Sequence, residues 1–159
     1  MLKLPDTIKM IITDFDGIMT DNFVYINENS HSTRRLNYKD VTGCFLLKRG
    51  GVNISIISGE RNPAIEWIKD TFELEDVHQR IWDKLPVMKS ILEKYGLSQD
   101  EYVYIGDDIN DLECLNYAKY KVTVPNATDR VKKVSGIQIT QEGGGEGAFR
   151  EVADCLIRK

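Results

Sequence analysis

The sequence is poor in the residue types on which several common chemistries depend. Only two histidines, His31 and His78, occur in the 159 residues, so neither a zinc site nor a histidine-assisted nucleophile is expected. The three cysteines, Cys44, Cys114 and Cys155, lie far apart in the chain and show no metal-binding spacing. An odd number of cysteines without a disulfide framework indicates reduced thiols, and we therefore expect a cytoplasmic protein.

Long apolar runs and an excess of basic charge are also missing. No stretch of about 18 apolar residues and no charged-then-apolar leader is present, so we expect neither a membrane span nor an export signal. The formal net charge of −4 offers no electrostatic footprint for nucleic acid or for an anionic membrane. We interpret the two basic clusters, Arg34–Arg35 and Lys132–Lys133, as solvated surface. The expected partners therefore include neither nucleic acid nor membranes.

The composition, with 42% hydrophobic and 29% charged residues, is typical of a globular protein that is long enough to bury a core. Short apolar runs alternate along the chain with stretches of helical periodicity. This alternation predicts an α/β fold, a Rossmann-like three-layer parallel sheet with helices on both faces. Since no internal repeat and no linker is visible, we expect one domain over residues 1–159.

Residues 22–38 alternate between polar and apolar side chains around a turn, which predicts a β-hairpin. This hairpin, one helix and one strand account for the 40 residues between Gly17 and Ser58. The 22 residues between Lys84 and Asp107 leave room for one helix and one strand only. We therefore predict a small hairpin flap and no cap domain.

Two aspartates, Asp14 and Asp16, follow an apolar run at residues 8–12 that is typical of a short buried strand. Gly17 lets the chain turn at once, so that both carboxylates can approach one bound ion. Taken alone, two aspartates in this spacing are more often an acidic turn than a site. Ligands of open α/β sheets, however, bind at the carboxyl ends of the strands, where these residues are expected to lie.

Polar residues follow three further predicted strands in the same way. They are Ser58 after residues 52–57, Lys84 after residues 77–82, and Asp107 with Asp108 after residues 102–105. Right-handed crossovers bring the carboxyl ends of parallel strands to one edge, which would then hold several mutually repelling carboxylates. A cation relieves this repulsion, and a set of oxygen ligands favours Mg²⁺. Since a lysine and a serine can bind phosphate oxygens, the arrangement predicts phosphoryl transfer.

The residue types predict a role for each member of this set. Asp14 would attack phosphorus to form an aspartyl-phosphate, and Asp16 would protonate the leaving alkoxide and later take a proton from water. Lys84 would pair with Asp14 and stabilise the equatorial phosphate oxygens. The expected Mg²⁺ ligands are Asp14, the backbone carbonyl of Asp16, and Asp107. The expected orienting groups, or ligands through water, are Asp108 and Asp111.

Four short stretches resemble the motifs of the haloacid dehalogenase superfamily. They are DFDGIMTD at residues 14–21, ISG at residues 57–59, DK at residues 83–84 and GDDIND at residues 106–111. The second aspartate of the first stretch, Asp16, resembles that of the phosphatase branch, because the dehalogenases lack this acid. The resemblance therefore implies a phosphatase that uses an aspartyl-phosphate and Mg²⁺.

Two further stretches narrow the resemblance. NYKD at residues 37–40 and GGEGAFRE at residues 144–151 are similar to the capless 3-deoxy-octulosonate 8-phosphate phosphatase family, over residues 8–157 as a whole. That family also contains nonulosonate (sialic-acid-type) 9-phosphate phosphatases and the C-terminal domain of animal CMP-sialate synthetases. The resemblance implies a small sugar-acid phosphate as substrate. The substrate contacts that we expect are Ser58, Gly59, Glu60, Asp40 and Arg150.

A site without a cap is open to water, which weakens the charge interactions on a small substrate, so we expect a neighbouring subunit to cover it. The resemblance implies a homotetramer in which the hairpins meet, with Phe23 and Tyr25 at an interface. The glycine-rich residues 143–147 and Arg150 would close on the site, with Arg150 meeting a substrate carboxylate. A simple glycine hinge before a helix explains the same segment equally well.

The exact substrate and two other functions stay open at this point. Octulosonate phosphatases usually carry an arginine after the Ser-Gly pair, whereas Glu60 stands here and resembles the nonulosonate branch; Arg61 is the nearest basic residue. An idle assembly domain, like the C-terminal domain of CMP-sialate synthetase, would have no need of the repelling acids. A phospho-acceptor signalling domain would carry its acceptor aspartate on the third strand rather than the first.

Overall fold

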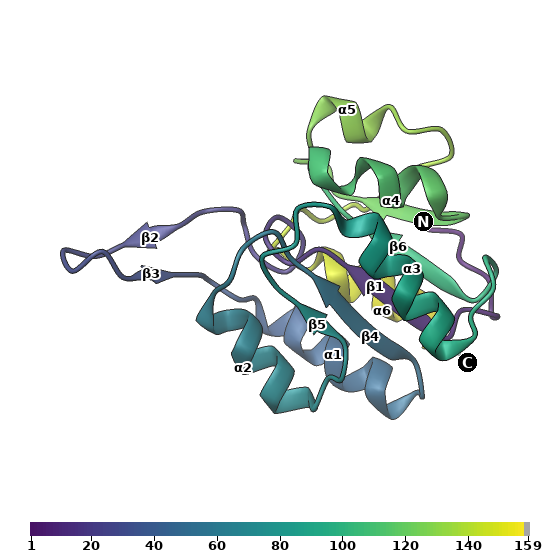
Figure 1. Cartoon of the computed structure of the whole chain (residues 1–159), viewed down its shortest axis with the longest axis horizontal. Helices are drawn as coiled ribbons and strands as arrows, with labels where there is room; N and C mark the ends of the chain where they lie inside the picture. The colour runs from purple at the N-terminus through teal and green to yellow at the C-terminus, as the bar shows by residue number, and fades with distance from the viewer. Residues whose placement is uncertain (158–159) are drawn as a thin grey trace.

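The alternating strands and helices build one six-stranded sheet in the order β5–β4–β1–β6–β7–β8, in which every neighbouring pair is parallel (Figure 1). The computed structural model describes residues 1–157, so the last two residues of the predicted domain lie outside the described part. The strands of this sheet are β1 (Met10–Thr13), β4 (Asn53–Ile57), β5 (Val77–His78), β6 (Tyr102–Ile105), β7 (Tyr120–Thr123) and β8 (Gln138–Ile139).

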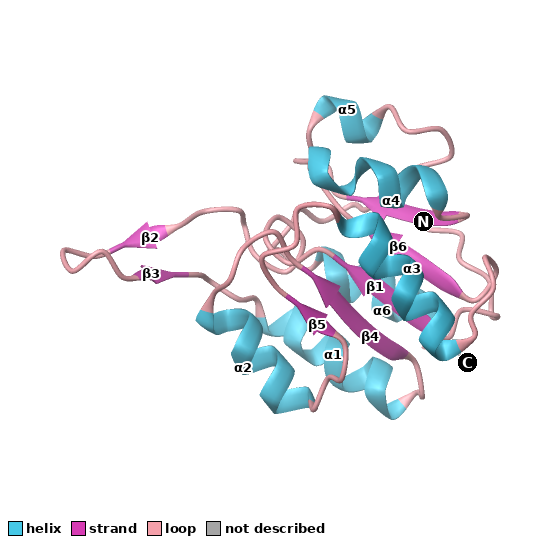
Figure 2. Cartoon of the chain, viewed as in Figure 1, coloured by secondary structure: helices cyan, strands magenta, loops and turns pink. Residues whose placement is uncertain are grey.

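Helices cover both faces of the sheet, which confirms the predicted Rossmann-like three-layer fold (Figure 2). Helix α1 packs against α6 on one face, and α3 packs against α4 on the other. None of the described helices is long and apolar enough to cross a bilayer. The helices are α1 (Tyr38–Arg49), α2 (Pro63–Phe72), α3 (Lys84–Tyr95), α4 (Leu112–Tyr117), α5 (Asp129–Lys132) and α6 (Ala148–Leu156).

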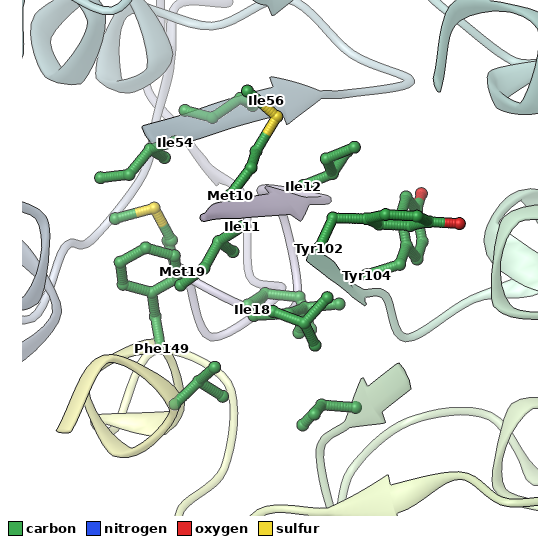
Figure 3. Close-up of a cluster of buried hydrophobic side chains, with 14 of the residues drawn as sticks. Met10, Ile11, Ile12, Ile18, Met19, Ile54, Ile56, Tyr102, Tyr104 and Phe149 are labelled. Atoms are coloured by element: carbon green, nitrogen blue, oxygen red, sulfur yellow. The ribbon is translucent and has the colours of Figure 1, made fainter. Parts of the chain in front are cut away.

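Strand β1 lies at the centre of the sheet between β4 and β6, and all four of its residues are buried. Its side chains pack among residues of both neighbouring strands and of α6, such as Ile54, Tyr104 and Phe149 (Figure 3). Burial of one such side chain stabilises a fold by about 1.5–3 kcal/mol. The core therefore holds the end of β1, and the residues that follow it, in the middle of the carboxyl edge.

The hairpin consists of β2 (Tyr25–Ile26) and β3 (Ser32–Thr33), which pair in antiparallel fashion and project from the body of the molecule (Figure 1). Its turn is stabilised by Asn27, whose Oδ1 accepts hydrogen bonds from the backbone N–H groups of Asn29 and His31, both at 3.0 Å. Within residues 1–157 no further insertion follows β1, so the predicted flap without a cap domain is confirmed.

The boundaries of several strands differ from the prediction. The first strand begins at Met10 rather than at residue 8. The strand expected over residues 77–82 comprises only Val77–His78, because Arg80 adopts a φ of 60° and the chain leaves the sheet there. A 3₁₀ turn, Ile109–Asp111, directly precedes α4. As a result, Asp111 lies at the junction of two helical segments beneath the sheet edge.

Candidate active site

The loop after β1 carries Asp14 across the carboxyl edge of the sheet towards β6. The backbone N–H of Asp14 donates to the carbonyl of Ile105 at 2.9 Å, and the N–H of Phe15 donates to Asp14 Oδ1 at 2.6 Å. Gly17 then turns with a φ of +89°, and a Cβ at this position would lie 2.0 Å from Asp107 Oδ2. Only glycine therefore allows this loop to approach Asp107 so closely.

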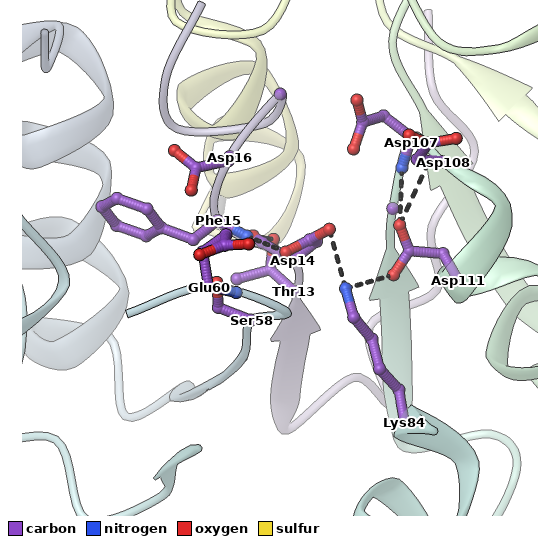
Figure 4. Close-up of polar contacts among 12 residues, drawn as sticks. Thr13, Asp14, Phe15, Asp16, Ser58, Glu60, Lys84, Asp107, Asp108 and Asp111 are labelled. Atoms are coloured by element: carbon purple, nitrogen blue, oxygen red, sulfur yellow. Dashed lines mark hydrogen bonds and ion pairs between the residues drawn. The ribbon is translucent and has the colours of Figure 1, made fainter. Parts of the chain in front are cut away.

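Lys84, the first residue of α3, is buried between two carboxylates (Figure 4). Its Nζ lies 2.7 Å from Asp14 Oδ2 and 2.8 Å from Asp111 Oδ1. Burial by itself would lower the pKa of Lys84, but Asp111 and Asp14 outweigh it, so the pKa is raised from its ordinary value. The lysine is therefore a charged bridge beneath the sheet edge.

Asp111 connects this lysine to the loop after β6. Its Oδ1 also accepts a hydrogen bond from the hydroxyl of Tyr104 at 2.7 Å. Its Oδ2 accepts from the backbone N–H groups of Asp107 at 3.0 Å and of Asp108 at 3.2 Å. These contacts place Asp111 between Lys84 and the backbone of Asp107, and its role as an orienting group stays a prediction.

Carboxylate oxygens of Asp14, Asp107 and Asp111 lie within 4.8 Å of one another and could hold a metal ion. Asp107 Oδ1 is buried and has no hydrogen-bond partner among the described residues. Burial, and then Asp111 and Asp108, raise the pKa of Asp107 to about 7. Burial and Asp111 likewise raise the pKa of Asp14 well above its ordinary value. One lysine does not balance this negative charge, so the site fits a divalent cation with oxygen ligands.

Asp16 lies at the same edge, but in Figure 4 its side chain points away from the Asp14–Lys84 pair. Its Oδ1 accepts hydrogen bonds from Thr20 Oγ1 and from Arg34 Nε, both at 3.0 Å. Its Oδ2 accepts from Asn62 Nδ2 at 3.3 Å. Asn62 is also the N-cap of α2, so the start of this helix holds one side of Asp16.

The prediction that Arg34 and Arg35 form solvated surface is wrong for Arg34. Its side chain is only 8% exposed and pairs with Asp16, whereas the side chain of Arg35 is 54% exposed. The excess of acids over lysines at the predicted site is the signal that could have indicated a second buried cation. The spacing of the hairpin residues does not show that the end of the hairpin, at Arg34, lies against the loop of residues 14–21.

An open pocket of about 160 Å³ lies at this edge. Most of the predicted site residues line it: Asp14, Asp16, Ser58, Gly59, Glu60, Asp107 and Asp108. Ser58 is buried, and its Oγ accepts a hydrogen bond from the N–H of Glu60 at 3.2 Å. Three further residues that were not predicted as site residues also line the pocket: Asn22, Trp82 and Asn110. Asn22 directly follows the motif at residues 14–21, Trp82 directly precedes the motif at residues 83–84, and Asn110 lies within the motif at residues 106–111. This proximity to the motifs is the only signal that could have identified them.

Two of the expected substrate contacts, Asp40 and Arg150, do not line this pocket. Asp40 is fully buried in α1, and its Oδ1 accepts a hydrogen bond from the backbone N–H of Arg150 at 2.9 Å. The side chain of Arg150 pairs with Asp154 at 2.7 Å instead of reaching the pocket. Within a single chain, therefore, Asp40 joins α1 to the start of α6, and neither residue reaches the site.

The glycine-rich segment before α6 does close on the first motif. The N–H of Gly145 donates to the carbonyl of Ile18 at 3.0 Å. A Cβ on Gly144 would lie 1.8 Å from the carbonyl oxygen of Gly17, so no larger residue fits there. This segment thus supports the loop that carries Asp14 and Asp16 from its outer side.

Comparison with known proteins agrees with this geometry. The family model of haloacid dehalogenase-like hydrolases matches residues 18–145. The 3-deoxy-D-manno-octulosonate 8-phosphate phosphatase of Escherichia coli K12 is 26% identical over 152 residues, which are 96% of this chain and 80% of that protein. A Moraxella catarrhalis enzyme of the same name, solved with magnesium, phosphate and KDO, is 29% identical at a TM-score of 0.90, over 96% of this chain and 87% of that one. The structure of the Yersinia pestis enzyme of this name is 27% identical, with a TM-score of 0.90, and the match covers 96% of this chain and 82% of that one.

The fold and the acid–lysine cluster, together with these relatives, define a phosphoric monoester hydrolase of the α/β class, as the sequence predicted. The chain belongs to the family of haloacid dehalogenase-like hydrolases.

Proposed function

We propose that this chain, as one domain, is a Mg²⁺-dependent phosphatase of a sugar-acid phosphate, either 3-deoxy-octulosonate 8-phosphate or a nonulosonate 9-phosphate. The convergence of Asp14, Lys84 and Asp107 at the end of the central strand is the observation that carries the proposal. An assembly domain without activity would gain nothing from burying several carboxylates that repel one another. We therefore favour the enzyme over the idle domain.

In the first step, a carboxylate oxygen of Asp14 attacks phosphorus, and the bond from phosphorus to the ester oxygen breaks. Asp16 donates a proton to the departing alkoxide, and an aspartyl-phosphate remains on Asp14. Asp14 must be ionised for this attack, and Lys84 at 2.7 Å favours the ionised form against the effect of burial. Lys84 also stabilises charge on the equatorial phosphate oxygens.

In the second step, water attacks the aspartyl-phosphate while Asp16 accepts a proton from it. The bond from phosphorus to Asp14 breaks, which releases inorganic phosphate and restores both acids. Ser58, which lines the pocket, would donate its hydroxyl hydrogen to a phosphate oxygen. Asp16 therefore transfers a proton in each step, in opposite directions.

The proposed metal ligands are Asp14, Asp107 and the backbone carbonyl of Asp16, with Asp108 and Asp111 as orienting groups. Bound there, Mg²⁺ would offset the negative charge of the carboxylates and of the phosphate. The Mg²⁺ in the Moraxella catarrhalis structure and the unpartnered Asp107 oxygen support this assignment. At a Mg²⁺ concentration of 100 times Kd, binding should raise the free energy of unfolding by about 2.7 kcal/mol.

The two candidate substrates differ in the length of the sugar acid. The names of the relatives favour the octulosonate, whereas Glu60 in the pocket favours the longer nonulosonate. Arg61 does not line the pocket; its side chain is 63% exposed and lies 3.8 Å from Glu66. A pocket of about 160 Å³ is smaller than the 300–1,000 Å³ typical of sites that enclose a small molecule, which leaves the carbon chain of either substrate uncovered.

A neighbouring subunit, in a homotetramer, is our proposal for the missing cover. Four consecutive apolar residues of the hairpin arm are exposed: Phe23, Val24, Tyr25 and Ile26. An apolar strip of this kind on a projecting hairpin is typical of an interface. We also propose that the enzyme is cytoplasmic, since an odd number of cysteines without a disulfide framework in the sequence indicates reduced thiols.

The direct test is phosphate release from both substrates, with Mg²⁺ and with EDTA. We expect hydrolysis of at least one ester only with Mg²⁺, and a loss on the order of 10⁴-fold for Asp14→Asn because the nucleophile is removed. Asp70→Asn is the matched control, since Asp70 is an exposed aspartate near the C-terminal end of α2 and does not line the pocket. Hydrolysis of neither ester, or an unchanged rate for Asp14→Asn, would contradict the proposal.

A further inference from the structure

Arg34 is a buried arginine to which the mechanism above assigns no role. It follows β3 on the returning arm of the hairpin, its side chain is 8% exposed, and its Nε lies 3.0 Å from Asp16 Oδ1. Arg35, the next residue, is 54% exposed and pairs with Asp21 and Glu146. Two adjacent arginines thus occupy opposite environments, and only the buried one reaches the proton-transferring acid.

The stability of the fold does not explain why Arg34 is buried. Its Nη1 is shielded from solvent and has no hydrogen-bond partner among residues 1–157. A buried donor without a partner costs free energy, and desolvation of a guanidinium adds to that cost. Among residues 1–157, the ion pair with Asp16 is the one polar contact of this side chain, so the position of Arg34 is best explained by its effect on the Asp16 carboxylate.

The carboxylate of Asp16 has a donor on each oxygen. Thr20 and Arg34 donate to Oδ1, and Asn62 donates to Oδ2 at a longer distance of 3.3 Å. Thr20 belongs to the same loop as Asp16, whereas Arg34 comes from the hairpin and brings a charge. A charge-assisted hydrogen bond is both stronger and more directional than a neutral one. Arg34 is therefore the contact best able to set the orientation of the carboxylate.

We propose that Arg34 is a positioning residue that holds the carboxylate of Asp16 in register for proton transfer, and so couples the base of the hairpin to the chemistry. This inference rests on the proposed function. Asp14 is held separately, by Lys84 on α3, so the loss of Arg34 leaves the nucleophile and its lysine in place. The effect of Arg34 is confined to the steps in which Asp16 transfers a proton.

The test compares Arg34→Gln, Arg34→Lys and the matched control Arg35→Gln, which removes the neighbouring arginine of the same arm. We expect kcat for the sugar-acid phosphate to fall about 10²-fold in Arg34→Gln with KM nearly unchanged, since a misplacement of about 1 Å can cost that much. Arg34→Lys should recover part of the loss, because it restores the charge without the planar guanidinium. Arg35→Gln should retain the activity of the wild type.

Dependence on the leaving group separates positioning from a general structural effect. The nitrophenolate of p-nitrophenyl phosphate leaves without a proton, so its kcat/KM, which reports the first step, should change little in Arg34→Gln. The kcat/KM for the alkyl ester should fall with kcat. Combined with Asp16→Asn, Arg34→Gln should cause no further loss, because the residue to be positioned is gone.

Equal losses on both esters, or additive losses in the double variant, would overturn the inference. If the wild type hydrolysed neither ester, the proposed function would fail, and the contact would be tested by urea unfolding instead. Arg34→Gln and Asp16→Asn must then show a non-additive effect on the midpoint of unfolding, measured against Arg35→Gln. Additive midpoints would overturn the inference independently of any activity.

Discussion

The carboxyl edge of the sheet and the hairpin differ in nearly every physical respect. At the edge, Lys84 and Asp111 are buried, charged and paired within 2.8 Å. In the hairpin, Phe23 and Ile26 are 68% and 69% exposed, and β2 and β3 have two residues each. The edge is complete within one chain, whereas a two-stranded hairpin with an apolar surface is only marginally stable by itself. This difference is the reason for our proposal that one subunit carries the reactive groups and a neighbouring subunit covers them.

Removal of Lys84 should cause the largest loss of stability. We expect Lys84→Met to lower the free energy of unfolding by about 3–5 kcal/mol, because it leaves buried carboxylates without their cation. The loss should be larger at pH 8 than at pH 5. Lys84 lowers the pKa of Asp14 against the effect of burial, so its removal should raise this pKa further above the ordinary value. The folded variant then holds the Asp14 proton to a higher pH than the folded wild type, and its stability falls more as pH rises.

Urea unfolding at the two pH values measures this effect. Lys89→Met is the control, because Lys89 is exposed on the same helix, with its Nζ 4.9 Å from the centre of the Tyr117 ring. A variant at Lys84 that was as stable as this control would show that the edge does not depend on its internal ion pairs.

Asp40 lies where the two regions meet, in the first turn of α1 after the hairpin. Burial raises its pKa to about 6, although the backbone N–H of Arg150 and the charge of Lys39 act in the opposite direction. Between the ordinary pKa and 6, the folded state retains a proton that the unfolded state releases, so this group lowers stability as pH rises. The decrease amounts to about 3 kcal/mol and ends above pH 6.

Asp40→Asn removes this titration while the other groups stay the same. The difference in unfolding free energy between variant and wild type, measured without metal from pH 4 to pH 7, should therefore shift by about 3 kcal/mol in favour of the variant. A constant difference over this range would mean that Asp40 is ionised in the fold, and that the junction between hairpin and α6 is more solvated than the structure shows.

Changes in the hairpin should have the smallest effect on the fold and the clearest effect on assembly. We expect Phe23→Ser with Ile26→Ser to change the unfolding free energy of the dissociated chain by no more than about 0.5 kcal/mol, since both side chains are exposed. Sedimentation velocity should show a tetramer for the wild type and smaller species for this variant, with a raised KM.

Ile139→Ser is the control for assembly, because Ile139 is 44% exposed on β8, at the edge of the sheet. A wild type that sediments as a fully active monomer would remove the need for a neighbouring subunit. The proposal that the site of one chain is left uncovered until a second subunit joins it would then be wrong.

Several features of the site could be predicted because they depend on local patterns. Apolar runs define β1, β4 and β6, and the polar residues directly after them, Asp14, Ser58 and Asp107, must lie at the carboxyl edge of a parallel sheet. The two-residue strand β5 was harder to place, because its pairing ends at His78. Lys84 was nevertheless predicted correctly as a partner of Asp14, since its helix starts at the same edge.

The contacts of three residues could not be predicted because they depend on the path of the chain in space. Arg34 is buried because the hairpin base folds back onto Asp16, 18 residues earlier. Asp40 is enclosed by α6, whose Arg150 lies 110 residues further along the chain. Arg150 itself pairs within its own helix. No periodicity or spacing encodes such contacts, since either arginine could equally well have been exposed.

The order of the strands, the acids at their ends and the absence of an inserted cap follow from the chain alone, because hydrophobic periodicity and the handedness of crossovers act locally. Only the folded structure determines the ion pairs of the site, such as Arg34 with Asp16, and the close packing of Gly144 against Gly17. Charge pairing and close packing act between atoms a few ångströms apart, and those neighbours exist only once distant segments have been brought together by the core.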